Sequence, residues 1–440
     1  MPLVSNDLAQ ACLPDSSQGI PQMNIHLVKA FYECFHPAHP ILPPFEIWTA
    51  SLPPQFLVNV VEFIGLHYTS PGQAAGYPHE LWVTIGNATL SLEKVQAYLL
   101  LSIALHARKA PDGAKEYIGS AIQCSYELGL HRRELSDAMK IQNVARAESM
   151  RRTLWEVFIV DTLLAAVQAG GTLQFSMGTP DVPLPSEDAI FEDGNSNIPL
   201  ISVKDLNRRL FTGDEQLSSL AYRVEATLIL RQCVIACETY ASEDTVQILD
   251  SLISTWFHRW PQGKSTILMS NGHVDQIDFQ AAMIINCASI YLHFPRSSLI
   301  PYLPTTREIF CSRPPSNTAP SPNAQMHTAK IVNAAVELSK LGSLSTSVTR
   351  HTPFFPCTLV LSSIVQLTAS SMQVGQRPGK YSSYLALNIA VLHSMGTIWD
   401  LAASDIGKIR DIACEVERTS TQPNKDIVEY ISIQSVHSSS

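Results

Sequence analysis

Basic residues are nearly missing from the first quarter of the sequence. Lys29 and Lys94 are the only lysine or arginine side chains before Arg108. The whole chain has 30 basic and 39 acidic residues, and its net charge is −9. Clustered lysine and arginine side chains grip nucleic-acid phosphates and anionic membranes, so a chain of this charge repels both. We therefore expect direct DNA binding by this chain to be weak or absent.

Paired cysteines are also missing. The nine cysteines include no C-x-x-C pair and their number is odd, which argues against a disulfide framework and fits reduced thiols in the cytosol or nucleus. Cys233 and Cys237 lie four residues apart on an expected helix, but a zinc site needs about four ligands and no second pair completes one. We interpret the two as core thiols and expect neither a metal nor another cofactor.

The sequence contains no Gly-rich phosphate loop, H-E-x-x-H, G-x-S-x-G or EF-hand motif, and no signal peptide. It also has no adjacent aspartate pair, which helical terpene synthases use to bind magnesium. These absences argue against an enzyme.

Residues 351–376 contain no charged side chain, but Ser362, Ser363 and Gln366 interrupt the apolar residues there, which favours a buried helix over a membrane span.

Apolar residues recur at helical spacing, and nothing indicates a strand. We predict an all-α fold: one large domain of packed antiparallel helices and helical hairpins over residues 23–404. A flexible leader at 1–22 precedes it, and a C-terminal helix and flexible tail follow at 405–440. The expected helices lie near residues 25–35, 55–68, 92–109, 114–128, 144–169, 215–240, 245–258, 277–293, 325–341, 357–373 and 382–403. The prolines of residues 36–45 predict extended backbone, and 172–211 and 295–322 read as surface loops.

Residues 92–128 predict an antiparallel hairpin that ends at Gly129. His131 follows this stop, where it could bind the last carbonyls of the helix. His106 lies on the first, mostly apolar helix and is expected to be a hydrogen-bonded core residue. His36 and His39 could bind a metal or act as a base, but no neighbouring acid or cysteine completes a site, so we expect them to be structural or exposed.

The helix expected at 144–169 carries the most informative charges. Residues 132–152, which end on this helix, contain five arginines that could grip an anion, but interspersed acids favour a solvated, salt-bridged face instead. They are Arg132, Arg133, Arg146, Arg151 and Arg152. Asp161 falls on the same stripe as core leucines, and a buried acid needs a partner. Arg152 is nine residues away, or about 13 Å along a helix, so the partner must come from another element. We interpret Asp161 as a structural anchor.

This segment resembles the core of the fungal-specific transcription factor domain, R-R-x-L-W-W…D…G-R-P. The matching residues are Arg151, Arg152, Trp155, Asp161 and the pair Gly170-Gly171. Three other segments, spread over about residues 24–403, agree in the expected order. They are the F-x-x-x-x-H-P-x-x-P-I-L opening with His36 and Pro40, the G-L-H-R hairpin end with Gly129 and His131, and a closing helix with Trp399.

The resemblance implies a nuclear transcriptional regulator, not an enzyme, that controls a metabolic or secondary-metabolite gene cluster. It would act by binding another transcription factor, a second copy of itself or a small-molecule effector. The matching residues would be structural. Two alternatives stay open: a helical enzyme with an apolar pocket that acts on a cluster metabolite, and a scaffold outside transcription.

The sequence departs from this family pattern in three places. Glu156 stands where the family has its second tryptophan, and Gly170-Gly171-Thr172 stands in place of G-R-P. Family members usually begin with a six-cysteine zinc cluster and a basic linker, whereas this sequence has Cys12 and Cys34 alone in that region. We expect a regulatory domain without a DNA-binding domain, or a truncated form.

Overall fold

The computed structural model describes residues 21–72, 79–168, 171–176, 178–193, 201–209, 217–239, 241–260, 267–269, 272–300, 323–344, 347–372 and 382–419. These residues form helices without a strand, apart from one isolated bridge between Leu268 and Val274. The all-α prediction is confirmed. Most of the expected leader, the end of the tail and Gly170 lie outside the described residues.

The helices run in chain order as α2 (Ile25–Cys34), α3 (Phe45–Ala50), α4 (Gln55–Thr69), α5 (His79–Asn87), α6 (Leu92–Ala107), α7 (Pro111–Glu127), α8 (Arg133–Gln142), α9 (Val144–Val167), α10 (Ala189–Asp193), α11 (Val203–Arg209), α12 (Ser219–Glu238), α13 (Glu243–Arg259), α14 (Gln276–His293), η3 (Phe294–Arg296), α15 (Ala324–Leu341), η6 (Val348–Arg350), α16 (Phe355–Met372), α17 (Ser382–Gly396) and α18 (Asp400–Thr419).

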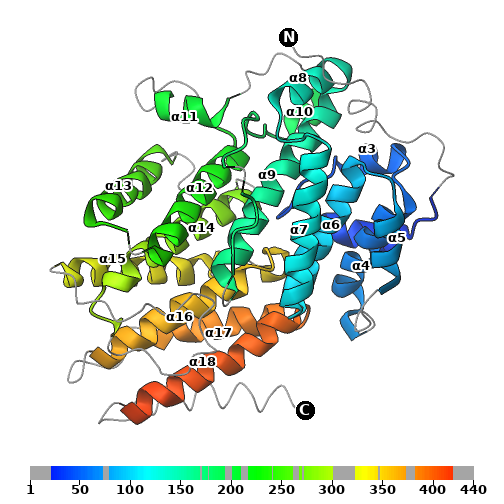
Figure 1. The fold of residues 1–440 in the computed structure, drawn as a ribbon. Helices are drawn as coiled ribbons and strands as arrows, with labels where there is room; N and C mark the ends of the chain where they lie inside the picture. The colour runs from blue at the N-terminus through cyan, green and yellow to red at the C-terminus, as the bar shows by residue number, and fades with distance from the viewer. Residues whose placement is uncertain are drawn as a thin grey trace.

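Helix α9 runs through the middle of the molecule (Figure 1). Helices α6 and α7 pack against it from the N-terminal half of the chain, and α12 packs against it from the other half. Helix α14 joins α12 to α15, and α15–α18 form the layer at the bottom of Figure 1. Every residue of α9 from Ala147 to Ala166 is buried. A helix buried all round must satisfy each of its polar side chains within the protein.

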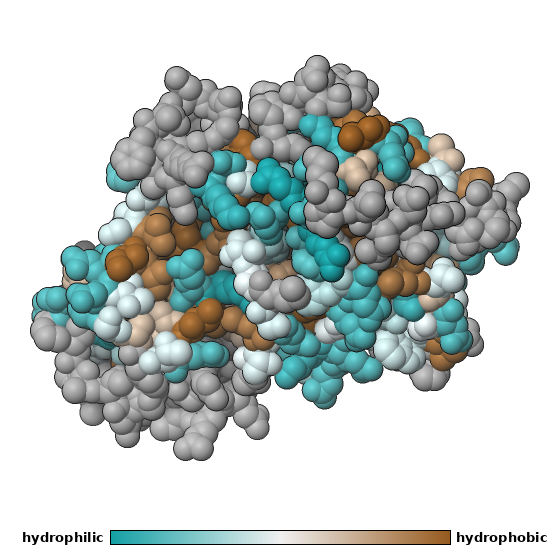
Figure 2. Space-filling view, turned by 45° about the horizontal axis from the view of Figure 1, so that its top comes forward, coloured by the Kyte–Doolittle hydropathy of each residue, from teal (hydrophilic) through white to brown (hydrophobic). Residues whose placement is uncertain are grey.

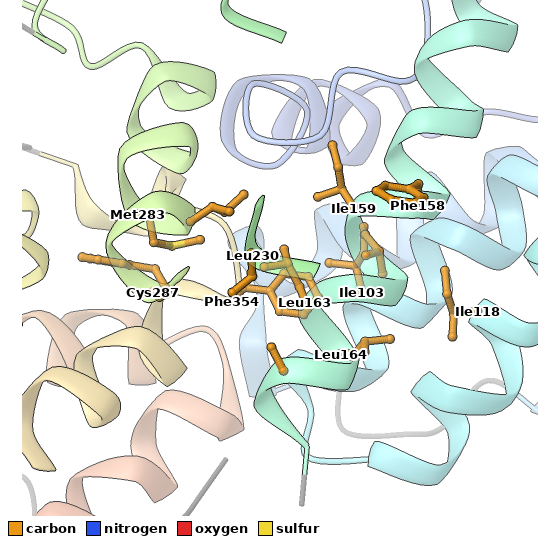
Figure 3. Close-up of a cluster of buried hydrophobic side chains, with 14 of the residues drawn as sticks. Ile103, Ile118, Phe158, Ile159, Leu163, Leu164, Leu230, Met283, Cys287 and Phe354 are labelled. Carbon is orange, nitrogen blue, oxygen red and sulfur yellow. The ribbon is translucent and has the colours of Figure 1, made fainter. Parts of the chain in front are cut away.

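The apolar part of α9 lies at the centre of the core. Figure 3 shows Phe158, Ile159, Leu163 and Leu164 of α9 among side chains from four other helices and the segment before α16. Those other side chains are Ile103, Ile118, Leu230, Met283, Cys287 and Phe354. On the face shown in Figure 2, by contrast, apolar residues form separate patches between hydrophilic ones.

Helices α6 and α7 form the expected hairpin, which ends in a left-handed turn at Gly129. The φ angle of Gly129 is 72°, a conformation that disfavours side chains with a Cβ. The backbone N–H groups of Gly129 and Leu130 donate to the carbonyls of Tyr126 and Ser125, which closes the helix end. His131 was expected to do this, and that expectation is wrong. Its ring packs edge-on against Tyr126, and its buried Nδ1 has no hydrogen-bond partner in the described part of the chain.

The single helix expected at 382–403 is two helices. Helix α17 ends at Gly396 and α18 begins at Asp400. A Cβ on Gly396 would lie 3.0 Å from the Cα of Ala403, so the missing side chain allows the two backbones to approach closely. Helix α18 continues to Thr419 and packs on α16 and α17. It therefore crosses the boundary expected at residue 404.

Two connecting segments also differ from expectation. Residues 35–39 form successive turns rather than extended backbone, with the His39 N–H donating to the His36 carbonyl. In the connection 172–211, residues 182–186 are buried and α10 and α11 are helical, so this part is not a surface loop. Helices α3, α5, α8, α10 and α11 were not predicted from sequence; none of them is longer than ten residues.

Helix α16 is long and apolar enough by composition to cross a membrane, but 83% of its apolar window is buried inside the protein. It packs against α15, α17 and α18. Its polar side chains bond within this bundle: Ser362 Oγ donates to the Ala335 carbonyl at 2.7 Å. This is the environment of a core helix.

Candidate functional site: the charged face of α9

Helix α9 buries three carboxylates, and each of them is paired with arginine. Glu148, Glu156 and Asp161 are at most 1% exposed. Their arginine partners lie on α9 itself for Glu148 and on α12 for the other two. We call these three groups the charged face of α9. A buried carboxylate without such a partner would cost several kcal/mol.

Glu148 binds the two consecutive arginines of the family motif. Its Oε2 accepts from Arg151 Nη2 at 2.6 Å, and its Oε1 accepts from Arg152 Nε at 2.9 Å. Both arginines are almost fully buried, at 1% and 3% exposed. The expectation of a solvated face is therefore wrong for them, although the salt bridging is present. An α-helical spacing of three and four residues brings the two guanidinium groups to the same carboxylate.

The same groups hold two distant segments against α9. Arg152 Nη1 donates to Asp188 Oδ1 at 2.6 Å and to the Pro40 carbonyl at 3.4 Å. Trp155 Nε1 donates to the Pro183 carbonyl at 2.9 Å. Burial alone would lower the pKa of Arg152, but Glu148 and Asp188 raise that pKa above its usual value. The arginine stays charged and ties the segments around Pro40 and residues 183–188 to the helix.

Glu156 occupies the centre of the charged face. Its Oε2 accepts from Arg223 Nη2 of α12, and its Oε1 accepts from His39 Nδ1 at 2.7 Å. Because Nδ1 of His39 donates, its Nε2 accepts from the Thr352 hydroxyl at 3.1 Å. Arg223 also donates to the Ala38 carbonyl at 3.1 Å. Glu156, His39 and Arg223 together join four parts of the chain that are far apart in sequence.

The pKa shifts of this group fit a neutral histidine beside an ion pair. Burial lowers the pKa of His39, although Glu156 opposes the change. Burial alone would raise the pKa of Glu156, but Arg223 and His39 hold that pKa below its usual value. Glu156 and Arg223 therefore carry opposite charges that cancel in the interior.

Asp161 receives its partner from α12, another element, as the helix spacing requires. Asp161 Oδ2 accepts from Arg231 Nη1 at 2.9 Å and from the Phe175 N–H at 3.1 Å. Its Oδ1 accepts from the Gln174 N–H at 2.9 Å. The carboxylate thereby fixes the chain that follows α9. This arrangement supports the interpretation of Asp161 as an anchor.

We expect Asp161→Asn to lower the free energy of unfolding by about 2–3 kcal/mol, because an amide NH₂ would face backbone donors and the ion pair would be lost. Urea denaturation of the purified chain measures this. Asp112→Asn is the matched control, since Asp112 is exposed at the start of α7 and should change stability by less than about 0.5 kcal/mol. Equal effects of the two substitutions would contradict the anchor role.

His36 is partly buried and Trp399 is buried, at separate places in the protein. His36 Nε2 donates to the Leu42 carbonyl at 2.9 Å, which shapes the turn leading to Pro40. Trp399 is 1% exposed and stacks on His67 at a ring distance of 4.8 Å. His106 is also buried as expected, stacked on Phe354 and 3.7 Å from the Cys357 sulfur.

Five buried or partly buried histidines predict that the fold is sensitive to acid. Burial lowers the pKa of His36, His67, His293 and His351 to about 4 and that of His106 to about 3. An unfolded histidine titrates near 6.5, so unfolding takes up protons between about pH 6.5 and pH 4. The stabilisation is complete above pH 6.5 and decreases as the pH falls through this window.

We therefore expect the free energy of unfolding to fall between pH 7.5 and pH 5.5 by up to about 1.4 kcal/mol for each such histidine. Urea titrations at constant ionic strength measure this, and calorimetry in two buffers of different ionisation enthalpy counts the protons taken up. Unfolded carboxylates titrate near pH 4, so they contribute little above pH 5.5. A free energy that stays constant across this range would contradict the prediction.

Cys233 and Cys237 lie four residues apart on α12. Cys233 is buried, Cys237 is partly buried, and burial raises the pKa of both, in the case of Cys237 to about 11. Within the described ranges, no three histidine, cysteine or acidic side chains are grouped so that they could hold a metal ion. These thiols are protonated core side chains.

Helix α9 itself carries four of the family-motif residues, the fold brings Pro40 to it, and the other motif residues lie elsewhere. Around α9 lie Arg151, Arg152, Trp155, Asp161 and Pro40. His36 shapes the neighbouring turn, and Gly129 forms the left-handed turn after α7. His131 packs on Tyr126 of α7, and Trp399 packs on α4. Sequence reasoning missed the pairing of Glu156 with Arg223 and His39. The signal was present, because a glutamate in an otherwise apolar helical run requires a buried partner.

The fold and the site define a class of protein: a helical domain built around one buried helix that carries charged side chains. The profile of the fungal specific transcription factor domain matches residues 28–259, more than half of the chain. The chain belongs to this family of transcription regulators. The matched region contains the whole of α9, together with Arg223 and Arg231.

A relative agrees with this assignment over a longer range. The C6 finger domain transcription factor iacK of Pestalotiopsis fici is 28% identical over 413 residues, which cover 89% of this chain. The chain spans 59% of the length of that relative. No solved structure matches the chain.

Proposed function

We propose that this protein regulates transcription of a metabolic or secondary-metabolite gene cluster in the nucleus. The observation that carries the proposal is the family match over residues 28–259, which covers the charged face of α9. A relative described as a C6 finger domain transcription factor supports it over most of the chain. The helical domain would act by binding a partner or a small-molecule effector.

The buried charges support a regulatory rather than a catalytic use of this domain. Glu148, Glu156 and Asp161 are bonded to arginines inside the protein, and each of these groups ties a connecting segment to the helix. A catalytic acid or base must reach its substrate, whereas these carboxylates already hold arginine and backbone donors. The arrangement keeps a large helical body in one shape, as a platform for partners requires.

Recognition of DNA would come from a partner. The chain carries a net charge of −9, and its first 107 residues hold only two basic side chains. A surface of this kind cannot release many counterions from DNA. We propose that the chain pairs with another transcription factor or with a second copy of itself.

Expression profiling of a deletion strain tests the regulatory function. The expected result is a changed level of mRNA for a contiguous block of biosynthetic genes, restored by the wild-type gene. An unchanged transcriptome under all conditions in which the protein is made would overturn the proposal and favour a scaffold outside transcription.

A mobility-shift titration at physiological salt separately tests whether DNA is recognised by a partner. The purified chain alone should not bind promoter fragments of the affected genes selectively, and addition of its partner should restore a selective shift. Tight, sequence-selective binding by the chain alone would show that a DNA-reading partner is not needed.

A further inference from the structure

The contact between α13, α14 and α15 holds two buried histidines that the charged face of α9 does not use. His293 is the last residue of α14, and His327 lies in the first turn of α15. Each is 1% exposed. Their Nδ1 atoms face one another at 2.9 Å, and the ring centres are 5.0 Å apart. Two neutral imidazoles at this distance share one proton, so one Nδ1 donates and the other accepts.

The acid at one end of this pair fixes the direction of the hydrogen bonds. Asp250 Oδ1 of α13 lies 3.0 Å from His293 Nε2, and Asp250 Oδ2 accepts from Lys330. A carboxylate can only accept, so His293 Nε2 carries a proton and its Nδ1 carries a lone pair. His327 must therefore donate from Nδ1. This leaves the lone pair of the His327 ring on Nε2.

That Nε2 is the open end of the chain of hydrogen bonds. It is buried, and it has no hydrogen-bond partner in the part of the molecule that is described. The nearest acid is Glu243 in the first turn of α13, whose Oε1 lies 3.9 Å away. This distance is too long for a hydrogen bond but suits an ion pair once the ring is charged.

We propose that Asp250, His293 and His327 form a proton-operated latch between α13 and α15. A proton from solvent adds to the His327 Nε2 lone pair, and no other bond has to break. The Nδ1–H of His327 continues to donate to His293, and His293 continues to donate to Asp250. The new imidazolium attracts Glu243 and draws the first turn of α13 onto α15.

The charges around the latch keep it open at neutral pH. Burial lowers the pKa of His327, and Glu243 opposes this effect, while Arg296 and Lys330 reinforce it. Arg296 also lies 3.8 Å from Glu243 and competes for that carboxylate. On the side of α12, burial raises the pKa of Cys237, so this thiol adds no charge. The latch closes only on acidification.

The latch lies between the family-matched region and the C-terminal helices, so it can couple the two. Asp250 and Glu243 lie within the family-matched region, whereas both histidines lie beyond residue 259. Helix α14 packs against α12, α13 and α15. A change in how tightly α13 is held therefore links the matched region to the C-terminal helices.

Histidine-selective ¹⁵N spectra of the full chain test the latch, with His327→Gln used to assign the signals. At pH 8 the expected result is a protonated Nδ1 and a bare Nε2 on His327. On titration toward pH 5, Nε2 should gain a proton while the circular dichroism spectrum stays that of the folded protein. A proton on Nε2 at pH 8, or no titration before unfolding, would overturn the proposal.

Glu243→Gln tests whether Glu243 pairs with the protonated His327 ring. Asp244→Asn is the matched control because Asp244 is the adjacent exposed acid on the same turn. Loss of Glu243 should lower the His327 midpoint by about 0.5–1 pH unit, and the control should leave it nearly unchanged. Hydrogen exchange in the first turn of α13, corrected for pH, should slow on acidification in wild type and not in Glu243→Gln. Equal midpoints in the two variants would overturn the latch.

Discussion

Glu156→Gln should reduce the free energy of unfolding by about 3–5 kcal/mol. The substitution keeps the size of the side chain but leaves the buried Arg223 guanidinium without its counter-charge. Arg223 is 2% exposed, so water cannot compensate it without opening the core. The hydrogen bond that His39 donates to Oε1 would also weaken. Urea denaturation followed by circular dichroism measures the loss.

Two comparisons make this result specific to the buried pair. Glu116→Gln removes the same charge from an exposed position on α7 and should change stability by less than about 0.5 kcal/mol. Glu156→Leu combined with Arg223→Met removes both charges and should recover at least half of the loss, because an apolar pair tolerates burial. A double variant as unstable as the single one would show that the ion pair is not the cause.

The long helices could be predicted because their apolar residues repeat at helical spacing. Helices α6, α7, α9 and α14 lie within a few residues of their expected bounds. The break between α17 and α18 was missed, because both sides continue the same apolar pattern and only the close approach at Gly396 requires a turn. The burial of residues 182–186 was missed for a different reason. It depends on Arg152 and Trp155, which lie on another element.

The sequence predicts how the charged residues of the candidate site are placed along α9, but not which residues of other elements they bind. The position of Asp161 on a core stripe required a partner from elsewhere, and Arg231 supplies it. That partner lies 70 residues away, and nothing local in the sequence selects it. Glu156 shows the same limit more strongly. Its departure from the family tryptophan was visible, but its partners His39 and Arg223 lie 117 and 67 residues away.

Substitution of Glu148 should cause the second large loss of stability. Glu148→Gln should lower the free energy of unfolding by about 3–5 kcal/mol, because one carboxylate neutralises two buried arginines. Asp188 still contacts Arg152, but Arg151 would lose its only ion-pair partner among the described residues. Glu148 Oε1 also accepts from the Ser186 N–H at 2.9 Å, so the segment at 183–188 should loosen as well.

Two measurements separate these consequences. Urea denaturation gives the global loss, and hydrogen exchange of residues 183–188 reports the local release, which should exceed that of α16. Asp137→Asn is the matched control, because it breaks an exposed ion pair with Arg133 at 4.0 Å and should cost less than about 0.5 kcal/mol. If Glu148→Gln were as mild as this control, the two family arginines would not depend on the glutamate.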